Sequence, residues 1–228
     1  MMVKIVHPQR PMWERRGAAS LTNREIWRRR PEVRRACETG AVSAPAEIPA
    51  LVSRALDLSR ERGFITSTRH ETGRLLATLA TTRAGTLAEL GTGCGVGAAW
   101  LHSGAPAGTR IVTAELDLAL AEQVQRLFAD IDSIDVISGD WSTLEEYAPF
   151  SLLFVDVKDV KESVDLVADL LEPGGIAVLD DFAPSAFWPP ISEGRVDTVR
   201  EQWLTDERFT AVEMLIDPDA SLIIAARR

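Results

Sequence analysis

Apolar and polar positions follow two alternating periods along most of the chain. Short apolar runs predict parallel strands at 86–90, 110–115, 134–138, 151–157 and 175–180. Apolar residues at helical spacing predict helices between these strands, at 98–103, 118–129 and 160–171, with a short helix near Leu144. Strands that alternate with single helices are typical of a parallel, doubly wound α/β sheet.

The pattern changes towards the C-terminal end. Apolar runs at 209–216 and 221–226 are separated by only four residues, 217–220, and follow a helix predicted at 196–204. Four residues cannot form a crossover helix, so the two runs predict an antiparallel hairpin. The predicted fold is therefore a Rossmann-like, seven-stranded α/β sheet with a C-terminal antiparallel hairpin.

Two helices are predicted before the first strand. Apolar spacing indicates one helix over 45–62, and Gly63 ends it. The spacing of Thr68 and Glu71 is that of a capping box, which predicts the start of a second helix that leads into the first strand.

Composition and charge exclude several classes of protein. The net charge is −9, which argues against nucleic acid as the main partner. The chain has no apolar run long enough to cross a membrane, and its first residues lack the apolar core of a signal peptide. The only cysteines are Cys37 and Cys94, which favours a reducing cytoplasm over a disulfide-forming compartment.

A glycine-rich turn follows the first predicted strand. Glycines occur at 91, 93, 95 and 97, and a helical pattern begins directly after them. Strand, glycine turn and helix are the form of a nucleotide-binding crossover, in which the backbone N–H groups of the new helix face a ligand. The pattern Gly93-x-Gly95-x-x-Ala98 also fits a dinucleotide-binding oxidoreductase, so NAD(P) remains an alternative ligand.

Two acidic residues flank this turn. Glu89 precedes the glycines, and Glu115 ends the second predicted strand. A carboxylate at Glu89 disfavours a phosphate and favours a cation. S-adenosylmethionine carries an ammonium and a sulfonium and no phosphate. The distance in sequence from the turn to Glu115 is near the roughly twenty residues expected for an acid that binds ribose hydroxyls.

Glu89-Leu-Gly-Thr-Gly93 together with Thr113-Ala-Glu115 resembles the class I S-adenosylmethionine-dependent methyltransferases. The resemblance implies S-adenosylmethionine as cofactor. In this family an acid after the third strand accepts a hydrogen bond from the adenine, and an adjacent aromatic residue stacks on the ring. The implied cofactor contacts are Glu89, Gly91, Thr92, Gly93, Gly95, Glu115, Leu116, Asp140, Trp141 and Asp156.

A narrower resemblance is to O-methyltransferases of the catechol and caffeoyl-CoA type. In that group the first residues of the helix before strand one touch the methionine end of the cofactor, which makes Thr68 a candidate beside Ser67 and His70. A small hydroxylated acceptor is implied, such as a catechol, another phenol or a hydroxylated natural product. The aromatic, proline-rich stretch 183–190 is expected to form a wall of the acceptor pocket.

Three carboxylates follow strands four and five, namely Asp156, Asp180 and Asp181. They should meet at the carboxyl edge of the sheet, where open α/β sheets bind ligands. In metal-dependent O-methyltransferases the corresponding residues hold a divalent ion, so the resemblance predicts Mg²⁺, Ca²⁺ or Mn²⁺ here. Such an ion would lower the pKa of the acceptor hydroxyl. In the alternative, Asp156 contacts only cofactor or substrate and the other two cap the next loop.

The sequence departs from the family pattern after strand four. Catechol-type enzymes have Asp-Ala-Asp-Lys there, whereas this chain has Asp156-Val157-Lys158-Asp159. The catalytic base is therefore open among Asp156, His70 and Lys158, the last only if burial lowers its pKa.

The family also suggests a division of the chain. Residues 1–62 are expected to be an N-terminal helical extension that covers the substrate or forms a dimer contact, and 63–228 the cofactor-binding domain. Trp13, Trp27 and the arginine run 24–35 should bury against a second acidic subunit, which predicts a homodimer. A non-catalytic nucleotide-binding module remains the other class of function.

Overall fold

The structure is a computed structural model, and the chain divides into two units, residues 1–41 and 42–228. It describes residues 47–64, 67–185 and 188–228, all of which belong to the second unit. Trp13, Trp27, Cys37 and the arginine run lie outside the described residues. The role predicted for the N-terminal extension therefore stays a prediction.

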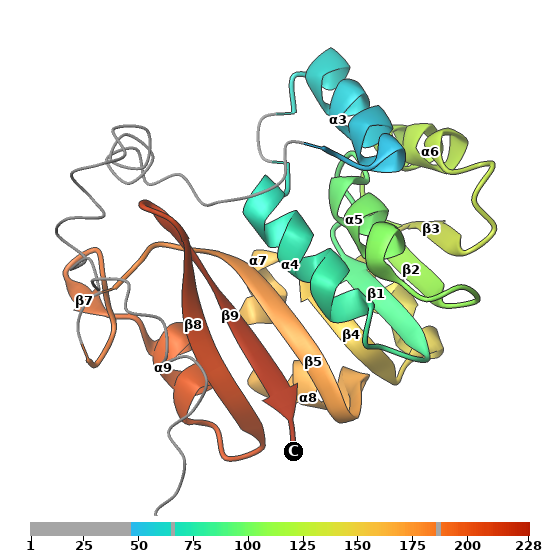
Figure 1. Cartoon of the computed structure of the whole chain (residues 1–228). Coiled ribbons are helices and arrows are strands. Elements are labelled where there is room, and N and C mark those ends of the chain that lie inside the picture. Colours follow the sequence, from blue (N-terminus) through green and yellow to red (C-terminus); the bar gives the residue numbers. More distant parts are fainter. Residues whose placement is uncertain (1–46, 65–66, 186–187) are drawn as a thin grey trace, which may run out of the picture. The chain divides into compact units, whose positions relative to one another are not determined.

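A seven-stranded sheet organises the second unit, with strand order β3-β2-β1-β4-β5-β9-β8 (Figure 1). The first five strands pair in parallel, and β9 is antiparallel to both β5 and β8. This confirms the predicted Rossmann-like sheet with its C-terminal hairpin. The strands are β1 Thr86–Leu90, β2 Arg110–Glu115, β3 Ile134–Ser138, β4 Phe150–Val155, β5 Leu171–Phe182, β8 Phe209–Asp217 and β9 Ala220–Arg227.

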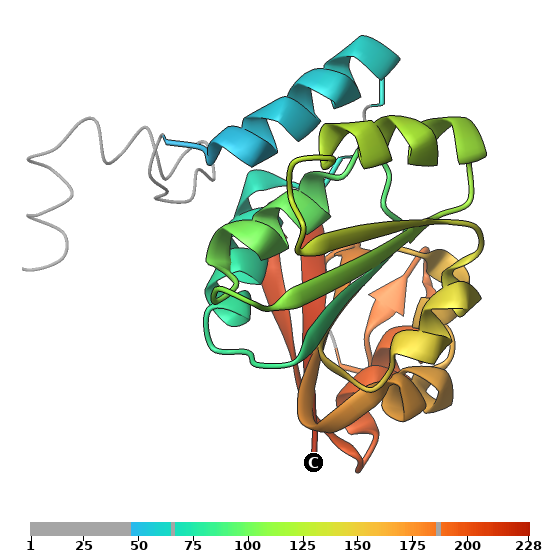
Figure 2. The ribbon, with the colours of Figure 1, turned by 90° about the vertical axis from the view of Figure 1, so that its right-hand side faces the viewer.

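Helices cover both faces of this sheet (Figures 1 and 2). One apolar cluster, which includes Leu76, Trp100 and Val124, packs the helices of the first half against one face. A second cluster, which includes Val167 and Trp203, packs the later helices against the other face. The helices are α3 Ala50–Arg62, α4 His70–Ala80, α5 Val96–Gly104, α6 Leu118–Leu127, η2 Trp141–Tyr147, α7 Lys158–Lys161, α8 Val164–Leu170 and α9 Thr198–Thr205.

The helix predicted at 160–171 is two short helices, α7 and α8. Ser163 lies between them, and its side chain accepts a hydrogen bond from the backbone N–H of Leu166. Serine competes with the helix for backbone groups and is favoured at such an N-terminal cap, which accounts for the break. A short hairpin of β6 (Ile191–Ser192) and β7 (Arg195–Val196), which the apolar pattern did not indicate, follows the expected pocket wall.

The first turn of α4 also differs from the prediction. The N-cap residue is Arg69, and no side chain caps this end, so the capping box from Thr68 to Glu71 does not form. The helix is positioned by packing instead. A Cβ on Gly73 would overlap the ring of Trp100, so only glycine allows α4 and α5 to lie this close. This contact sets where the first turn of α4 meets the end of β5.

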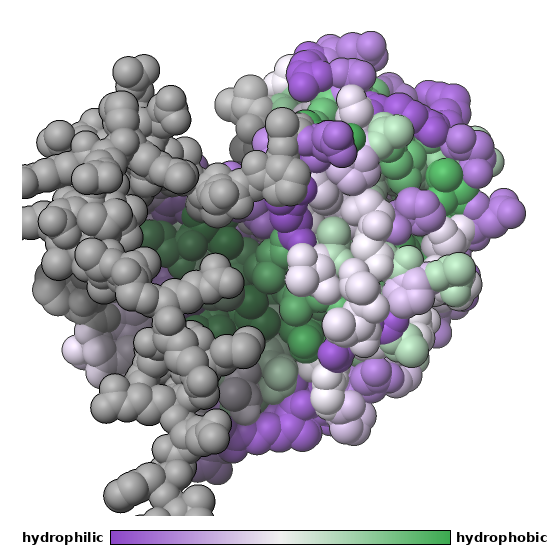
Figure 3. All heavy atoms as spheres, in the orientation of Figure 1, coloured by the Kyte–Doolittle hydropathy of each residue, from purple (hydrophilic) through white to green (hydrophobic). Residues whose placement is uncertain are grey.

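The surface includes an apolar area over the C-terminal strands (Figure 3). Val212 and Met214 on β8 are 52% and 39% exposed, although both are large hydrophobic residues. Across the described part of the chain, no helix combines the length and hydrophobicity needed to span a membrane.

Candidate active site

The glycine turn leads from β1 into α5 at the carboxyl edge of the sheet. Gly91, Gly93 and Gly95 have φ values of 91°, 53° and 82°, which residues with a Cβ rarely adopt. Gly95 is the N-cap of α5, and a Cβ there would lie 2.8 Å from the ring of Phe128. Substitution at this position would therefore distort the turn.

Glu89 lies beneath the turn and is only 1% exposed. Its carboxylate accepts a hydrogen bond of 2.8 Å from the hydroxyl of Thr113. That hydroxyl is also 2.6 Å from the hydroxyl of Thr92. Burial raises the pKa of Glu89 well above its usual range, although the bonds from Thr113 and from the backbone of Ala98 oppose this shift. Glu89 therefore ties β1, β2 and the start of α5 together, and cofactor contact by Glu89 and Thr92 stays a prediction.

Glu115, by contrast, lies in the opening of the turn. One carboxylate oxygen accepts the N–H of Gly93 at 2.8 Å, and the other accepts the N–H of Asp117 at 2.9 Å. A carboxylate oxygen can accept a second hydrogen bond, so Glu115 retains the capacity to bind two adjacent hydroxyls. Leu116 follows it and is 71% exposed, which leaves an apolar surface beside this carboxylate.

The end of β3 lies next to Glu115. The N–H of Gly139 donates to the backbone carbonyl of Glu115 at 2.8 Å. Asp140 is exposed and caps η2, since its side chain accepts the N–H of Ser142 at 3.0 Å. Hydrogen bonds from Ser142 lower the pKa of Asp140. Trp141 is half-buried and packs against the second apolar cluster.

Asp156 joins the glycine turn to a cavity. Its backbone N–H donates to the carbonyl of Leu90 at 3.1 Å, and its own carbonyl would lie 3.6 Å from a Cβ on Gly91. Burial and the nearby charge of Asp181 raise the pKa of Asp156 to about 7, whereas Lys161 opposes the shift. The cavity measures about 440 Å³ and is lined by Asp156, Lys158, Lys161, Glu162, Asp181, Phe182 and Val199.

The other two predicted carboxylates lie at the end of β5. Asp180 is 3% exposed, and the hydroxyl of Thr72 on α4 donates to it at 3.4 Å. Burial raises the pKa of Asp180. Asp181 is exposed, has a φ of 60° and forms an ion pair of 2.8 Å with Arg69. The structure thus brings Asp156, Asp180 and Asp181 into one electrostatic group.

The sequence interpretation missed two cations at this edge, Arg69 and Lys161. The ammonium of Lys161 donates to the backbone carbonyl of Asp180 at 2.8 Å and lies 5.9 Å from the ring centre of Phe182. Lys161 is one helical turn after Lys158, and this spacing placed it on the same helix face. Arg69 lies within the Thr68–Glu71 motif, but its reach to β5 depends on how α4 packs.

Two candidates near α4 contact other elements. The hydroxyl of Ser67 forms a hydrogen bond with Ser59 on α3. His70 is exposed, and its ring lies edge-on to Trp100 on α5 with the ring centres 6.4 Å apart. Thr68 lies between them in sequence and is half-buried.

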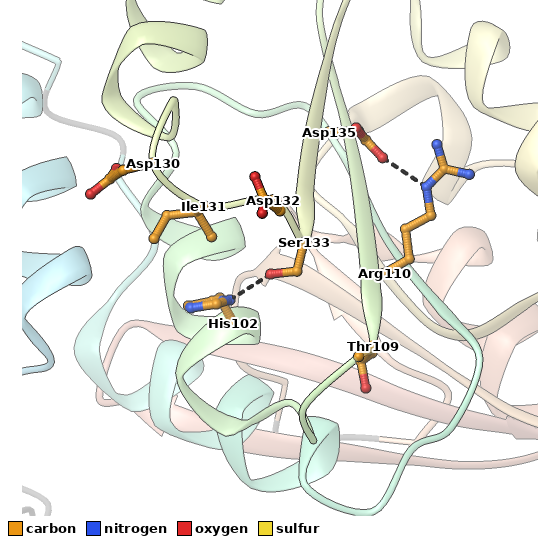
Figure 4. Close-up of a pocket in the computed structure, with 9 residues that line it drawn as sticks. His102, Thr109, Arg110, Asp130, Ile131, Asp132, Ser133 and Asp135 are labelled. Carbon is orange, nitrogen blue, oxygen red and sulfur yellow. Dashed lines mark hydrogen bonds and ion pairs between the residues drawn. The ribbon is translucent and has the colours of Figure 1, made fainter.

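A second pocket, of about 540 Å³, lies at the opposite end of the sheet (Figure 4). Arg110, the first residue of β2, lines it, whereas Glu115 is the last residue of that strand. Four of its polar side chains form two pairs, because Arg110 bonds Asp135 at 2.7 Å and His102 lies 3.1 Å from the hydroxyl of Ser133. No residue predicted to bind cofactor or acceptor lines this pocket.

Comparison with known proteins extends the fold assignment. No family model matches the sequence, and no curated protein matches it either. An O-methyltransferase from Bacillus cereus, solved in complex with S-adenosylhomocysteine, is similar in structure with a TM-score of 0.64 and 20% identity, over 80% of this chain and 93% of that one.

Two further structures are similar over most of their length. The O-methyltransferase TomG from Streptomyces achromogenes, involved in tomaymycin synthesis and solved with S-adenosylmethionine, has a TM-score of 0.64 and 22% identity over 80% of this chain and 92% of that one. The methyltransferase PaMTH1 from Podospora anserina, bound to S-adenosylhomocysteine, has a TM-score of 0.62 and 20% identity over 93% and 100% of the two chains. The chain therefore has the fold of the class I methyltransferases.

Proposed function

We propose that this chain is an S-adenosylmethionine-dependent methyltransferase that methylates an oxygen of a small hydroxylated acceptor, such as a catechol, another phenol or a hydroxylated natural product. The observation that carries the proposal is the arrangement of Glu115. Its carboxylate is fixed by two backbone N–H groups and keeps acceptor capacity for a pair of hydroxyls. The same sheet edge carries Asp156 and its cavity.

The cofactor would lie along this edge. Glu115 would bind the ribose hydroxyls, and Leu116 and Trp141 would contact the adenine. Asp140 would accept a hydrogen bond from the amino group of the adenine. The turn from Gly91 to Gly95, with Thr92, would lie against the methionine part, and Thr68 and Asp156 would close that end. The Bacillus and Streptomyces relatives in fold were solved with S-adenosylhomocysteine and S-adenosylmethionine, which supports the same cofactor here.

The chemistry is displacement at the methyl carbon. Bound S-adenosylmethionine would supply the methyl group: the acceptor oxygen would bond to this carbon as the carbon–sulfur bond breaks, which would leave the neutral thioether of S-adenosylhomocysteine. The proton of the acceptor hydroxyl passes to a base. Asp156 is the proposed base because it touches the glycine turn through its backbone and lines the cavity with its side chain. Lys158, which is exposed on the same cavity, is the second candidate.

A divalent ion held by Asp156, Asp180 and Asp181 remains a prediction from the sequence. Among residues 47–64, 67–185 and 188–228, no group of three or more His, Cys, Asp or Glu side chains is arranged to hold a metal ion. Asp181 is also paired with Arg69. The residues as arranged do not fit Mg²⁺, Ca²⁺ or Mn²⁺, so no step above uses a metal.

Two alternatives compete with this proposal. An NAD(P)-dependent oxidoreductase would need a phosphate site at the glycine turn, whereas here the carboxylate of Glu115 accepts the N–H of Gly93 in that turn. A non-catalytic nucleotide-binding module would bind the cofactor without turnover. The antiparallel strands at the C-terminal edge favour a methyltransferase over a dehydrogenase.

Calorimetry with S-adenosylhomocysteine and with NAD distinguishes the proposed methyltransferase from an NAD(P)-dependent oxidoreductase. We expect S-adenosylhomocysteine to bind and NAD to bind weakly or not at all. Glu115→Gln should weaken the binding of S-adenosylhomocysteine about tenfold to a hundredfold, because hydrogen bonds to a charged group contribute about 1.5–3 kcal/mol. Glu122→Gln, a matched change on the exposed face of α6, should bind as the natural chain does. Tight NAD binding without a response to S-adenosylhomocysteine would contradict the proposal.

An assay of turnover distinguishes the proposed methyltransferase from a non-catalytic nucleotide-binding module. A panel of catechols, phenolic acids and hydroxylated natural products, assayed for release of S-adenosylhomocysteine, should contain at least one acceptor. Cofactor binding with no release across this panel would favour the non-catalytic module.

We also propose a homodimer in the cytoplasm. The exposed apolar side chains of β8 support an interface, because large exposed apolar areas mark interaction sites more often than free surface. The cytoplasmic placement rests on the use of cysteine, since Cys94 is buried and free within the glycine turn.

A further inference from the structure

The carboxyl edge of β4 and β5 carries three carboxylates, those of Asp156, Asp180 and Asp181, and the cavity beside it is lined largely by charged residues. Burial raises the pKa of Asp156 and of Asp180, and the charge of Asp181 adds to the rise at both carboxylates. Neighbouring carboxylates disfavour one another's charged forms, and a cation beside them favours those forms. A cation that compensates the charge of these carboxylates is therefore expected at this site.

Arg69 supplies that cation from the protein itself. Its guanidinium is 2.8 Å from a carboxylate oxygen of Asp181. The charge of Arg69, the N-cap of α4, also opposes the rise in the pKa of Asp180 and of Asp156, so its electrostatic effect extends beyond the ion pair. Lys161 adds a second positive charge through its bond to the carbonyl of Asp180.

The pairing between Arg69 and Asp181 serves little purpose in stability. Their side chains are 37% and 53% exposed, and ion pairs at such exposed positions contribute little to the free energy of folding. Asp181 nevertheless has a left-handed backbone with φ of 60°, which is uncommon outside glycine. Unusual backbone conformations of this kind concentrate at functional sites. We infer that the ion pair positions the carboxylate of Asp181 for function and contributes little to the stability of the fold.

A divalent ion would have to displace this guanidinium. A cation that shares Asp181 with Arg69 would be repelled by it, and removing Arg69 would leave the oxygen ligands that hard ions prefer. We propose that Arg69 is the fixed cation of the Asp156–Asp180–Asp181 edge: it provides the charge compensation of a metal ion and, acting through Asp181, positions the edge for metal-independent methyl transfer. This inference rests on the proposed methyltransferase function.

Metal binding tests the proposal without an assay of activity. The full chain, saturated with S-adenosylhomocysteine, is titrated with Mn²⁺ and followed by electron paramagnetic resonance. The natural chain should bind no Mn²⁺ at this edge, Arg69→Gln should gain a Mn²⁺ site, and the double variant with Asp181→Asn should lose it again. Arg83→Gln is the matched control, because Arg83 lies beyond the other end of α4 and bonds the carbonyl of Gly174.

Two results would overturn the proposal. One is Mn²⁺ binding by the natural chain that Asp181→Asn removes, and the other is an Arg69→Gln variant that binds no Mn²⁺. Failure of the proposed function is distinguishable, because it appears as the absence of S-adenosylhomocysteine binding, whereas the Mn²⁺ comparison can be made without that ligand. Thermal melts should show all variants folded.

Turnover provides a second arm once an acceptor is known. Exhaustive chelation should leave the activity of the natural chain unchanged. Under the same conditions the kcat of Arg69→Gln should fall at least about tenfold, which is the effect expected from the loss of one charge-assisted hydrogen bond. The affinity of this variant for S-adenosylhomocysteine should stay the same. Arg69→Lys keeps a point charge but not the planar fork, so it should lose less. Activity of the natural chain that disappears with chelation and returns with Mg²⁺ would overturn the proposal.

Discussion

At the scale of single residues, Glu89 shows how one carboxylate can organise a ligand site from beneath. It bonds Thr113, and the added charge of Asp156 reinforces the effect of burial in raising its pKa. The folded protein therefore holds this proton more tightly than the unfolded chain does. A group whose pKa rises on folding contributes stability at low pH, and that contribution is lost as the pH rises through the folded pKa.

Glu89→Gln removes this titration while it keeps the shape of the side chain. We expect the melting temperature of the variant, relative to that of the natural chain, to increase steadily from about pH 5 to about pH 8, whatever the offset at the lowest pH. Thermal melts across this range measure it, with the exposed Glu122→Gln as control. A temperature difference that stays constant with pH would show that Glu89 does not titrate in this way.

At the scale of elements, the end of β5 is held in place from the opposite face by α9. Arg200 on α9 is 1% exposed and bonds the carbonyl of Ala183, directly after β5. It also pairs with Glu213 on β8 at 3.2 Å and with Asp197 at 3.3 Å. This buried arginine joins three elements at the segment that carries the acidic edge.

Arg200→Met should therefore destabilise the fold. Removing one partner leaves Glu213 and Asp197 without their buried cation, and such losses cost about 3–5 kcal/mol. Denaturant unfolding measures the change in free energy. Arg126→Met, which breaks an exposed pair with Glu122, should cost less than about 1 kcal/mol. Equal effects of the two variants would mean that the Arg200 network adds nothing beyond a surface pair.

At the scale of the whole molecule, the exposed β8 strand is the surface to examine for self-association. An edge strand has unpaired backbone groups, and β8 adds the exposed side chains of Val212, Met214 and Leu215. Both features favour a contact with a second copy.

Light scattering at micromolar concentration should give twice the chain mass of 25.0 kDa. Val212→Glu together with Met214→Glu should shift the mass to that of the monomer, because charge is disfavoured in the core of an interface. Leu118→Glu, a matched change at an exposed leucine on α6, should leave the mass unchanged. A monomeric mass for the natural chain would contradict the homodimer, and an unchanged mass for the β8 variant would exclude this strand as the contact.

The sequence by itself determined the sheet, the hairpin and the edge at which the carboxylates meet. Local periodicity sufficed, since apolar runs of strand length alternate with helical spacing and the residues 217–220 leave no room for a crossover. The placement of Glu115 and Asp156 at strand ends followed from the same periodicity, because parallel strands end at a common edge. The break at Ser163 was missed because the apolar spacing continues through it.

Only the tertiary structure decided which charges face one another. Glu89 is an acid before a glycine turn in the sequence, and folding places it beneath the turn instead of in its opening. Arg69 and Asp181 are far apart in the chain and meet because Gly73 lets α4 pack closely on α5. Pairings of this kind depend on the relative positions of packed elements, which local sequence periods do not encode. The cation that compensates the acidic edge is therefore visible only in the folded protein.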